Sequence, residues 1–345
     1  MLNKPSSADL MSLAGALVSI PSVTGEEGAL GDFLSGHLSG HGFHVEEQTV
    51  DGRRRNILAV GGPSPRVLLC THQDTVPPFI PASEDEDFLY GRGSCDAKGI
   101  MAAMVHALRT MSPEVRAACG LLFVVGEETD SAGAERANSL SVRPEFIIVG
   151  EPTENKLGLG HLGYIALRII ARGKKAHSGY PHLGQSAVLK LVDVLQKLRG
   201  LDLGQDPVLG RTLLNIGRLE GGVAANVIPD LAWAEVSIRS GLPSRDILDK
   251  VREAVAGQAE LELQVASEAQ KLFTVAGFET TVLSYGTDIP HLRVFGRPLL
   301  LGPGSILEAH IDKERISKRE MREAAGLYQK LIMRLLSEPT PGSRT

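Results

Sequence analysis

The sequence predicts an α/β protein in which a smaller α+β domain is inserted into a larger α/β domain. Short apolar strands alternate with helical segments in the N-terminal half, which is typical of an α/β unit with a parallel or mixed sheet. Near residue 162 the order becomes β-α-β-β-α-β, the ferredoxin-like layout, and α/β character returns from about residue 270. We therefore expect an α/β domain of residues 1–161 and 271–345 around an inserted domain of residues 162–270.

The larger domain begins with amphipathic helices predicted at residues 8–19 and 24–40. Thr24 and Glu27 have the spacing of a capping box for the second helix. Apolar runs bounded by polar residues predict strands, and they lie at residues 56–60, 67–71, 119–126 and 146–150. Two further helices are predicted, over residues 97–111 and 318–336.

The inserted domain has about 110 residues, within the normal size range of a domain. Its predicted strands lie at residues 164–171, 212–219, 231–239 and 261–265, and its predicted helices at residues 185–198 and 245–256.

Composition excludes several classes of function. Hydrophobic residues make up 43% of the 345 residues and charged residues 22%, which predicts a globular protein with a large core. A net charge of −5 without a basic run argues against nucleic-acid binding. No apolar run approaches the ~20 residues of a membrane span, and no secretory signal is evident. Three cysteines without a disulfide spacing fit a reducing cytoplasm, so any metal would be bound by histidine and carboxylate.

The first candidate site follows the strand at residues 67–71. His72 and Asp74 are two apart, so in an extended segment they point to the same side. One ring nitrogen of His72 could bind a metal while Asp74 accepts a hydrogen bond from the other. Taken alone, a strand-end histidine beside a surface aspartate is the more ordinary interpretation.

Other acidic residues follow strands or lie in loops of the same domain. Asp96 lies in a glycine-rich loop before a helix, where an N-cap would be ordinary. Glu127 and Glu128 follow one apolar strand and Glu151 follows another, where a solvated loop would be ordinary. Adjacent carboxylates repel each other, and a cation would offset that repulsion. His310 precedes the last helix.

Two histidines and three carboxylates suit zinc, with cobalt or manganese as substitutes. One bridging carboxylate, with one histidine and one terminal carboxylate per ion, gives two open zinc sites. Glu127 is then free to act as a general base. The candidate metal ligands are His72, Asp96, Glu128, Glu151 and His310.

These ordered motifs resemble the di-zinc hydrolases that include acetylornithine deacetylase, succinyl-diaminopimelate desuccinylase, aminoacylase and carboxypeptidase. The resemblance covers nearly the whole chain, and it implies a zinc-hydrolase-type catalytic domain of residues 1–161 and 271–345 with a lid or dimerisation domain of residues 162–270. It rests on Ile20-Pro21-Ser22 with Glu26, His72-x-Asp74-x-x-Pro77, Gly91-Arg92-Gly93 with Asp96-x-Lys98-Gly99, Glu127-Glu128, Gly150-Glu151-Pro152, Gly302-Pro303-Gly304 and His310.

The resemblance implies a role for each matching position. Asp96 would bridge two zinc ions, with His72 and Glu151 on one ion and Glu128 and His310 on the other. Asp74 would orient His72. Glu127 would take a proton from a water between the ions and pass it to the leaving amine.

In the inserted domain, Ala176-His177-Ser178-Gly179 resembles the family's lid motif. The resemblance implies that His177 donates to the tetrahedral oxyanion in the partner subunit of a homodimer, although a turn histidine is the ordinary alternative. Asn226 and Arg239 match positions that hold polar groups of the substrate, and an ordinary strand-end charge is the alternative for Arg239. Thr287 lies in a segment that lines the substrate pocket in relatives.

We therefore expect a cytoplasmic, metal-dependent amidohydrolase that acts on an N-acyl amino acid or a short peptide. An acetylornithine or acetyl-lysine deacetylase is favoured, because no arginine follows Gly286-Thr287-Asp288 to bind a succinyl group, although His291 could serve. Dipeptidase, carboxypeptidase and desuccinylase activities on the same zinc pair remain alternatives. An inactive binding homologue would have lost a ligand or the base, and none is lost. The sequence leaves the acyl group and the native metal open.

Overall fold

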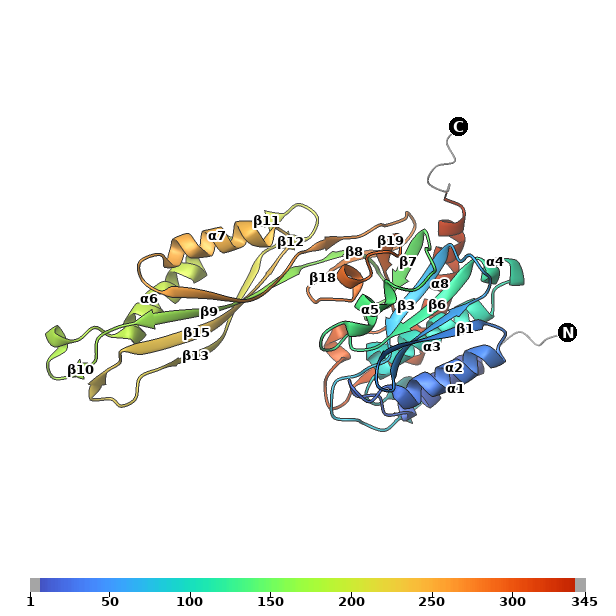
Figure 1. Ribbon diagram of the computed structural model, residues 1–345, viewed down its shortest axis with the longest axis horizontal. Coiled ribbons are helices and arrows are strands. Elements are labelled where there is room, and N and C mark those ends of the chain that lie inside the picture. Colours follow the sequence, from blue (N-terminus) through green and yellow to red (C-terminus); the bar gives the residue numbers. More distant parts are fainter. Residues whose placement is uncertain (1–6, 339–345) are drawn as a thin grey trace, which may run out of the picture. The chain divides into compact units, whose positions relative to one another are not determined.

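The computed structural model describes residues 7–338, which fold as two compact units (Figure 1). The first unit contains the residues up to Gly158, Leu272–Thr281 and the residues from Thr287 onward, and the second contains Leu159–Lys271 and Val282–Gly286. The predicted fold class, an α/β domain with an inserted ferredoxin-like α+β domain, is confirmed. Within residues 7–338, no helix is both long and apolar enough to span a membrane.

The first unit is built on a six-stranded mixed sheet with the order β1-β2-β6-β3-β7-β19 (Figure 1). Its strands are β1 (His44–Asp51), β2 (Arg54–Val60), β3 (Val67–His72), β6 (Cys119–Val124), β7 (Phe146–Val149) and β19 (Arg297–Leu300). β2 is antiparallel to β1 and β6, whereas β6, β3, β7 and β19 run parallel to one another. The carboxyl ends of these parallel strands therefore lie at one edge of the sheet, where α/β proteins place functional groups.

One face of this sheet shares an apolar core with four helices. Alternate residues of each strand, among them Ile57, Leu69 and Phe123, belong to this core because successive strand residues point to opposite faces. The helices are α1 (Ser7–Ser19), α2 (Gly28–Gly40), α3 (Gly99–Arg109) and α8 (Lys318–Leu336). A short helix, α5 (Ala132–Ala137), contacts β1, β2 and β6.

Shorter elements complete the first unit and its boundary. They are α4 (Pro113–Ala117) and the small sheet of β4 (Ser83–Glu84), β5 (Phe88–Tyr90) and β20 (Arg315–Ser317). A π-helical segment, η1 (Ser94–Lys98), and two 3-10 turns, η3 (Ile289–His291) and η4 (Ile306–Glu308), lie between the larger elements. The sheet of β8 (Leu157–His161), β17 (Gln270–Lys271) and β18 (Thr280–Leu283) lies at the boundary in the chain.

The second unit is a four-stranded antiparallel sheet packed against two helices. The sheet order is β13-β15-β9-β16, and the chain order is β9-α6-β13-β15-α7-β16, as the sequence predicts (Figure 1). The bounds are β9 (Gly163–Arg172), α6 (Ala187–Gly200), β13 (Leu213–Gly221), β15 (Leu231–Ser240), α7 (Ser244–Val255) and β16 (Glu260–Ser267). Short pieces connect them: β10 (Ala176–His177), η2 (Pro181–Leu183), β11 (Gln205–Asp206), β12 (Gly210–Arg211) and β14 (Val227–Ile228).

The predicted capping box of α2 is wrong. The helix begins at Gly28, and no side chain caps its first turn. The Thr24 hydroxyl instead donates to the Asp74 carboxylate at 2.8 Å. Glu27 accepts hydrogen bonds from the Arg54 guanidinium at 3.1–3.2 Å and from the Gly25 amide at 2.9 Å. Both candidate capping side chains are engaged by partners that no local pattern shows.

His37 makes the stability of the first unit depend on pH. Burial, together with the smaller effects of the nearby positive charges of His41 and Arg109, lowers its pKa from 6.5 to about 4. Its ring stacks on Phe33 at a centroid distance of 5.6 Å and contacts the His41 ring in a tilted arrangement at 4.3 Å. The unfolded chain takes up this proton near pH 6.5 and the folded chain only near pH 4, so the stabilising contribution is lost as the pH falls between these values.

We expect His37→Phe, which cannot titrate, to weaken this acid sensitivity. Between pH 7 and pH 5 the free energy of unfolding, measured with urea, should fall less in the variant than in the wild type. His44→Phe, at an exposed position, is the control and should behave as the wild type. Equal pH dependence of wild type and His37→Phe would contradict the prediction.

Candidate functional site

The first site residue is His72, the last residue of β3, and it is 1% exposed. Its Nδ1 lies 2.9 Å from the backbone oxygen of Asp74, which can only accept, so Nδ1 carries the proton. In the neutral ring its Nε2 then presents a lone pair, and this atom faces Asp96 Oδ1 at 3.0 Å. Two acceptors at this distance require a proton or a metal ion between them.

Asp96 stands between two histidines, one on each carboxylate oxygen. Oδ1 faces His72, and Oδ2 lies 3.3 Å from Nε2 of His310. His310 Nε2 is also 3.0 Å from Glu128 Oε1. The ligand atoms of His72, Asp96 and Glu151 lie within 4.8 Å of one another, and so do those of Asp96, Glu128 and His310. Asp96 is thus shared by two groups of three.

A buried ion pair holds the backbone of Asp96 in place. Glu314 Oε1 accepts hydrogen bonds from the amides of Cys95 and Asp96 at 3.1 and 3.2 Å. Its Oε2 pairs with Arg92 Nη1 at 2.6 Å, and both side chains are 1–2% exposed. η1 departs from helical geometry at Asp96 itself, so its conformation is set by these contacts rather than by a helical hydrogen-bond ladder.

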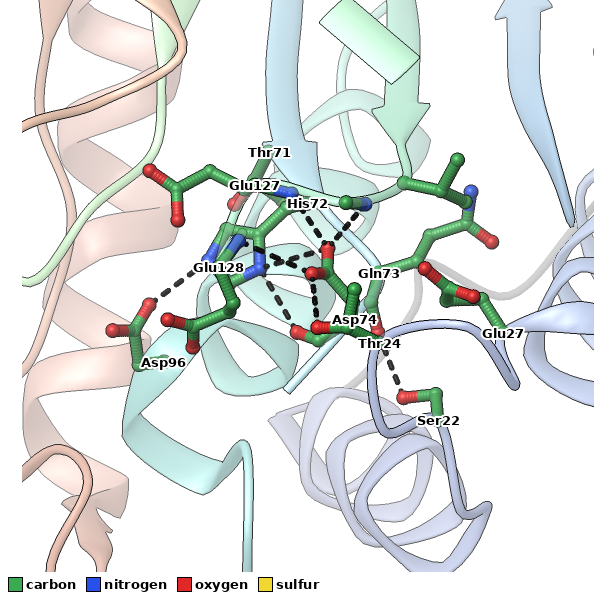
Figure 2. Close-up of polar contacts among 12 residues, drawn as sticks. Ser22, Thr24, Glu27, Thr71, His72, Gln73, Asp74, Asp96, Glu127 and Glu128 are labelled. Atoms are coloured by element: carbon green, nitrogen blue, oxygen red, sulfur yellow. Dashed lines mark hydrogen bonds and ion pairs between the residues drawn. The ribbon is translucent and has the colours of Figure 1, made fainter. Parts of the chain in front are cut away.

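The Glu127–Glu128 pair lies on the turn that follows β6. Gly126 has φ +84°, and a Cβ there would lie 2.7 Å from Arg54 Nη2, so the turn requires glycine. The Asp74 carboxylate accepts hydrogen bonds from the amides of Gly126, Glu127 and Glu128 at 2.9, 3.1 and 3.2 Å (Figure 2). Its Oδ1 is 3.6 Å from His72 Nδ1. The Asp74 carboxylate therefore binds the turn, and the Asp74 carbonyl is what orients His72.

Glu151 is the third member of one group, and His310 is the third member of the other. Glu151 follows β7 and is 4% exposed. His310 follows η4 with φ +62°, a left-handed conformation that is uncommon outside glycine and that concentrates at functional sites. Its side chain is 44% exposed, so this part of the site is accessible to solvent.

The site concentrates negative charge. Burial raises the pKa of Glu127 well above its usual range, and the charges of Asp288, Asp96 and Glu128 add to the effect. Burial likewise raises the pKa of Glu151. Hydrogen bonds to Asp96 and Glu128 raise the pKa of His310 to about 10. A potential that holds protons this strongly also attracts a divalent cation.

The donor set fits a pair of metal ions. Each group offers one imidazole nitrogen and two carboxylate oxygens, including one from the shared Asp96, and Zn²⁺ or a similar ion binds such donors. Three protein ligands per ion leave a coordination position open, as in catalytic rather than structural sites. Glu127 belongs to neither group. In Figure 2 its carboxylate points away from Asp74, on the side of His72 where Asp96 lies.

The other predicted residues are distributed between the two units. Thr287 is in the first unit, 7% exposed, and its hydroxyl accepts a hydrogen bond from the Ile289 amide at 3.2 Å. His177, Asn226 and Arg239 belong to the second unit. His177 and Asn226 are exposed, whereas Arg239 is partly buried with its guanidinium 4.2 Å from the centre of the Tyr164 ring.

Sequence reasoning missed the residues that support the ligands. Glu314 lies four positions after His310, yet its partners, Arg92 and the Asp96 amide, are more than 200 residues away in the chain. Thr24 was assigned to a helix cap. Asp288 is 2% exposed, and burial raises its pKa to about 6. Its carboxylate hydrogen-bonds to the Ser131 side chain, while Oδ1 has no hydrogen-bond partner within residues 7–338.

Comparison with known proteins agrees with this geometry. The sequence profile described as Peptidase family M20/M25/M40 matches residues 68–334. A probable carboxypeptidase of Aspergillus terreus is 41% identical over an alignment of 374 residues. The alignment covers 95% of this chain and 86% of that protein.

Two solved structures show the same fold. A tripeptidase from Staphylococcus aureus has a TM-score of 0.80 at 21% identity, covering 97% of this chain and 100% of its own. A dinuclear metal-binding peptidase of the M20 family from Bacillus subtilis has a TM-score of 0.69 at 14% identity, covering 96% of this chain and 99% of its own.

We expect metal-depleted protein to bind two divalent ions per chain, as in other two-metal hydrolases. Glu128→Gln removes a ligand from only one group, so one ion should still bind tightly and the other weakly. Glu154→Gln, at an exposed position three residues after Glu151, is the control and should keep both. Calorimetric titration with Zn²⁺ or Co²⁺ measures both steps. Identical titrations of the two variants would remove Glu128 from the ligand set.

Proposed function

We propose that this chain, which belongs to peptidase family M20/M25/M40, is a metal-dependent hydrolase that releases the C-terminal amino acid from short peptides and, by the same chemistry, from N-acyl amino acids. The observation that carries the proposal is the pair of three-residue groups sharing Asp96, with Glu127 beside them and outside both. This arrangement provides binding sites for two ions and leaves a carboxylate for proton transfer.

Glu127 has the properties of a general base and acid. A metal pair held by the two groups would supply the Lewis acidity that polarises a scissile carbonyl and makes an attacking water more acidic. Glu127 takes the proton from that water and delivers it to the leaving amine nitrogen. Because Glu127 belongs to neither group of ligands, its carboxylate is available for both proton transfers.

Arg239 supports specificity for a free carboxylate. Its guanidinium stacks on Tyr164, and no carboxylate of residues 7–338 forms an ion pair with it. A half-buried cation without a counter-ion is suited to a substrate carboxylate. The C-terminal residue of a peptide and the amino acid of an N-acyl amino acid both place that carboxylate next to the scissile amide. The name of the Aspergillus terreus relative, probable carboxypeptidase, agrees with this specificity.

His177 supplies a candidate donor to the tetrahedral oxyanion. The amide of Gly179 donates to His177 Nδ1 at 3.0 Å, so the proton of the neutral ring lies on Nε2. The ring is exposed at the end of β10, where His177 is paired with Val227 of β14. A fixed tautomer with an exposed N–H can donate to an oxygen on which charge develops.

We further propose that the protein is a homodimer formed through the second unit and that His177 acts on substrate bound by the partner. β13 is an edge strand with unpaired backbone groups, and Leu213 and Leu219 on it are each 49% exposed. On α6, which contacts β13, Leu189 and Val192 are 66% and 45% exposed. An open edge beside exposed apolar side chains favours twofold pairing.

A matched set of substrates tests the proposed reaction. With two equivalents of Zn²⁺ or Co²⁺ added, we expect hydrolysis of a simple dipeptide and of its N-acetylated form, but not of the dipeptide with an amidated C-terminus. Acetylornithine, acetyl-lysine and succinyl-diaminopimelate in the same panel identify the preferred acyl group. Loss of activity on N-acetylation but not on C-terminal amidation would establish an aminopeptidase instead.

Glu127→Gln tests whether Glu127 is the general base. It should keep both metal ions and lose about 10²–10⁴-fold in turnover on the preferred substrate. Metal content is measured by atomic absorption on the same sample. Turnover near that of the wild type with both ions retained would assign the base to another residue.

Mixing inactive subunits tests the role of His177 in the dimer. His177→Ala should lower turnover by about 10²–10³-fold, the usual effect of removing an oxyanion donor, without changing metal content. In a mixed dimer of His177→Ala and Glu127→Gln chains, one site carries both defects and the other carries neither, so activity should partly return.

Two tags, one on each variant, allow the mixed dimer to be purified and subunit exchange to be verified. An inactive purified mixed dimer would place His177 in its own subunit's site or outside the chemistry. A fully active monomer would exclude the assembly.

A further inference from the structure

Asp74 has a hydrogen-bond pattern that its position next to His72 does not explain. Its side chain is fully buried and accepts four hydrogen bonds. Oδ1 accepts from the amides of Gly126 and Glu127, and Oδ2 accepts from the amide of Glu128 and from the Thr24 hydroxyl. The four donors belong to two segments about 100 residues apart in the chain, and the carboxylate links them.

The segment carrying Thr24 is attached to the strand end by its backbone. Val23 forms a parallel bridge with Thr75, the amide of Thr24 donates to the Thr75 carbonyl at 3.2 Å, and the amide of Thr75 donates to the Ser22 carbonyl at 3.0 Å. The Ser22 hydroxyl donates to the Gln73 carbonyl at 2.7 Å (Figure 2). These bonds lie on both sides of Asp74, so they fix the direction from which the Thr24 hydroxyl approaches.

The Thr24 hydroxyl is the only side-chain donor within 3.5 Å of this carboxylate among residues 7–338, since the other three bonds come from backbone amides. Without it, Oδ2 would keep a single hydrogen bond, to the Glu128 amide at 3.2 Å, and the carboxylate plane could rotate. Rotation would move the amides of Glu127 and Glu128, because both are bound to it. Glu127 is the proposed general base, and Glu128 is a candidate metal ligand.

We propose that Thr24 is a positioning residue that acts through the Asp74 carboxylate on the Gly126–Glu128 turn, and through the turn on Glu127. The catalytic part of this inference rests on the proposed function, in which Glu127 transfers the proton. The structural part does not depend on it: the Thr24 hydroxyl orders the turn whether or not substrate is present.

Thr24→Val and Thr24→Ser are a matched pair for the test. Valine has the shape of threonine but no donor, and serine keeps the donor without the methyl group. In metal-free protein, we expect the amides of Gly126, Glu127 and Glu128 to exchange hydrogen faster in Thr24→Val than in the wild type and Thr24→Ser. Thr49→Val, at an exposed position on β1, is the control and should leave this exchange unchanged.

Kinetics give the second readout. Thr24→Val should lower kcat by about 10- to 100-fold, the effect expected of misplacing a catalytic group by a fraction of an ångström to 1 Å, with KM little changed. Thr24→Ser should restore kcat. If Thr24→Val unfolds, Thr24→Ala replaces it, with thermal unfolding measured for each variant.

The outcomes separate the two levels of the argument. Wild-type exchange in the turn of folded Thr24→Val would overturn the proposal, as would equal losses in Thr24→Val and Thr24→Ser, which would implicate the methyl group. If the wild type hydrolyses none of the substrates, the proposed function fails, and the exchange comparison still decides whether Thr24 orders the turn.

Discussion

The burial of several carboxylates around two histidines is the constraint on which the first unit depends. Asp96 and Glu151 are 4–6% exposed. The negative charges of Asp96 and Glu128 act on Glu127, and those of Glu127 and Asp96 act on Glu151. Like charges are costly to bury together unless protons or cations compensate them. The parallel order of β6, β3 and β7 makes this concentration unavoidable, because the segments that follow these strands all leave the sheet at one edge.

Two further carboxylates, neither of them in the two groups of ligands, hold these residues by their backbones. Glu314 accepts from the amides of Cys95 and Asp96, and Asp74 accepts from three consecutive amides of the Gly126–Glu128 turn. A carboxylate that binds backbone amides fixes the position of a residue's backbone. It does not compete for the functional group of that residue's side chain. The ligands and the base therefore keep their oxygens available for metal, water and substrate.

The two units make different contributions to the proposed reaction. The first supplies the candidate metal ligands and the proton-transfer group on strand ends and short turns that a rigid sheet supports. The second offers Arg239 and His177, a cation without a counter-ion and an exposed N–H, which are suited to the carboxylate of the substrate and to the oxyanion. In the proposed reaction, metal binding and proton transfer thus belong to residues of the first unit, and contacts with the substrate carboxylate and the oxyanion to residues of the second.

The sequence by itself determined the fold class, the ferredoxin-like order of the second unit and the long helix over residues 318–336, because periodicity and strand–helix order are local properties. It also singled out acids at strand ends, since a polar residue after an apolar run is visible without a structure. Only the tertiary structure decided that Asp96 presents one oxygen to each histidine, that Glu314 holds its amide, and that Thr24 binds Asp74 rather than capping α2. These contacts join segments 24 to 218 residues apart, and the physical reason they escape sequence reasoning is that a side chain's hydrogen-bond partner is set by strand order and packing, which no local pattern encodes.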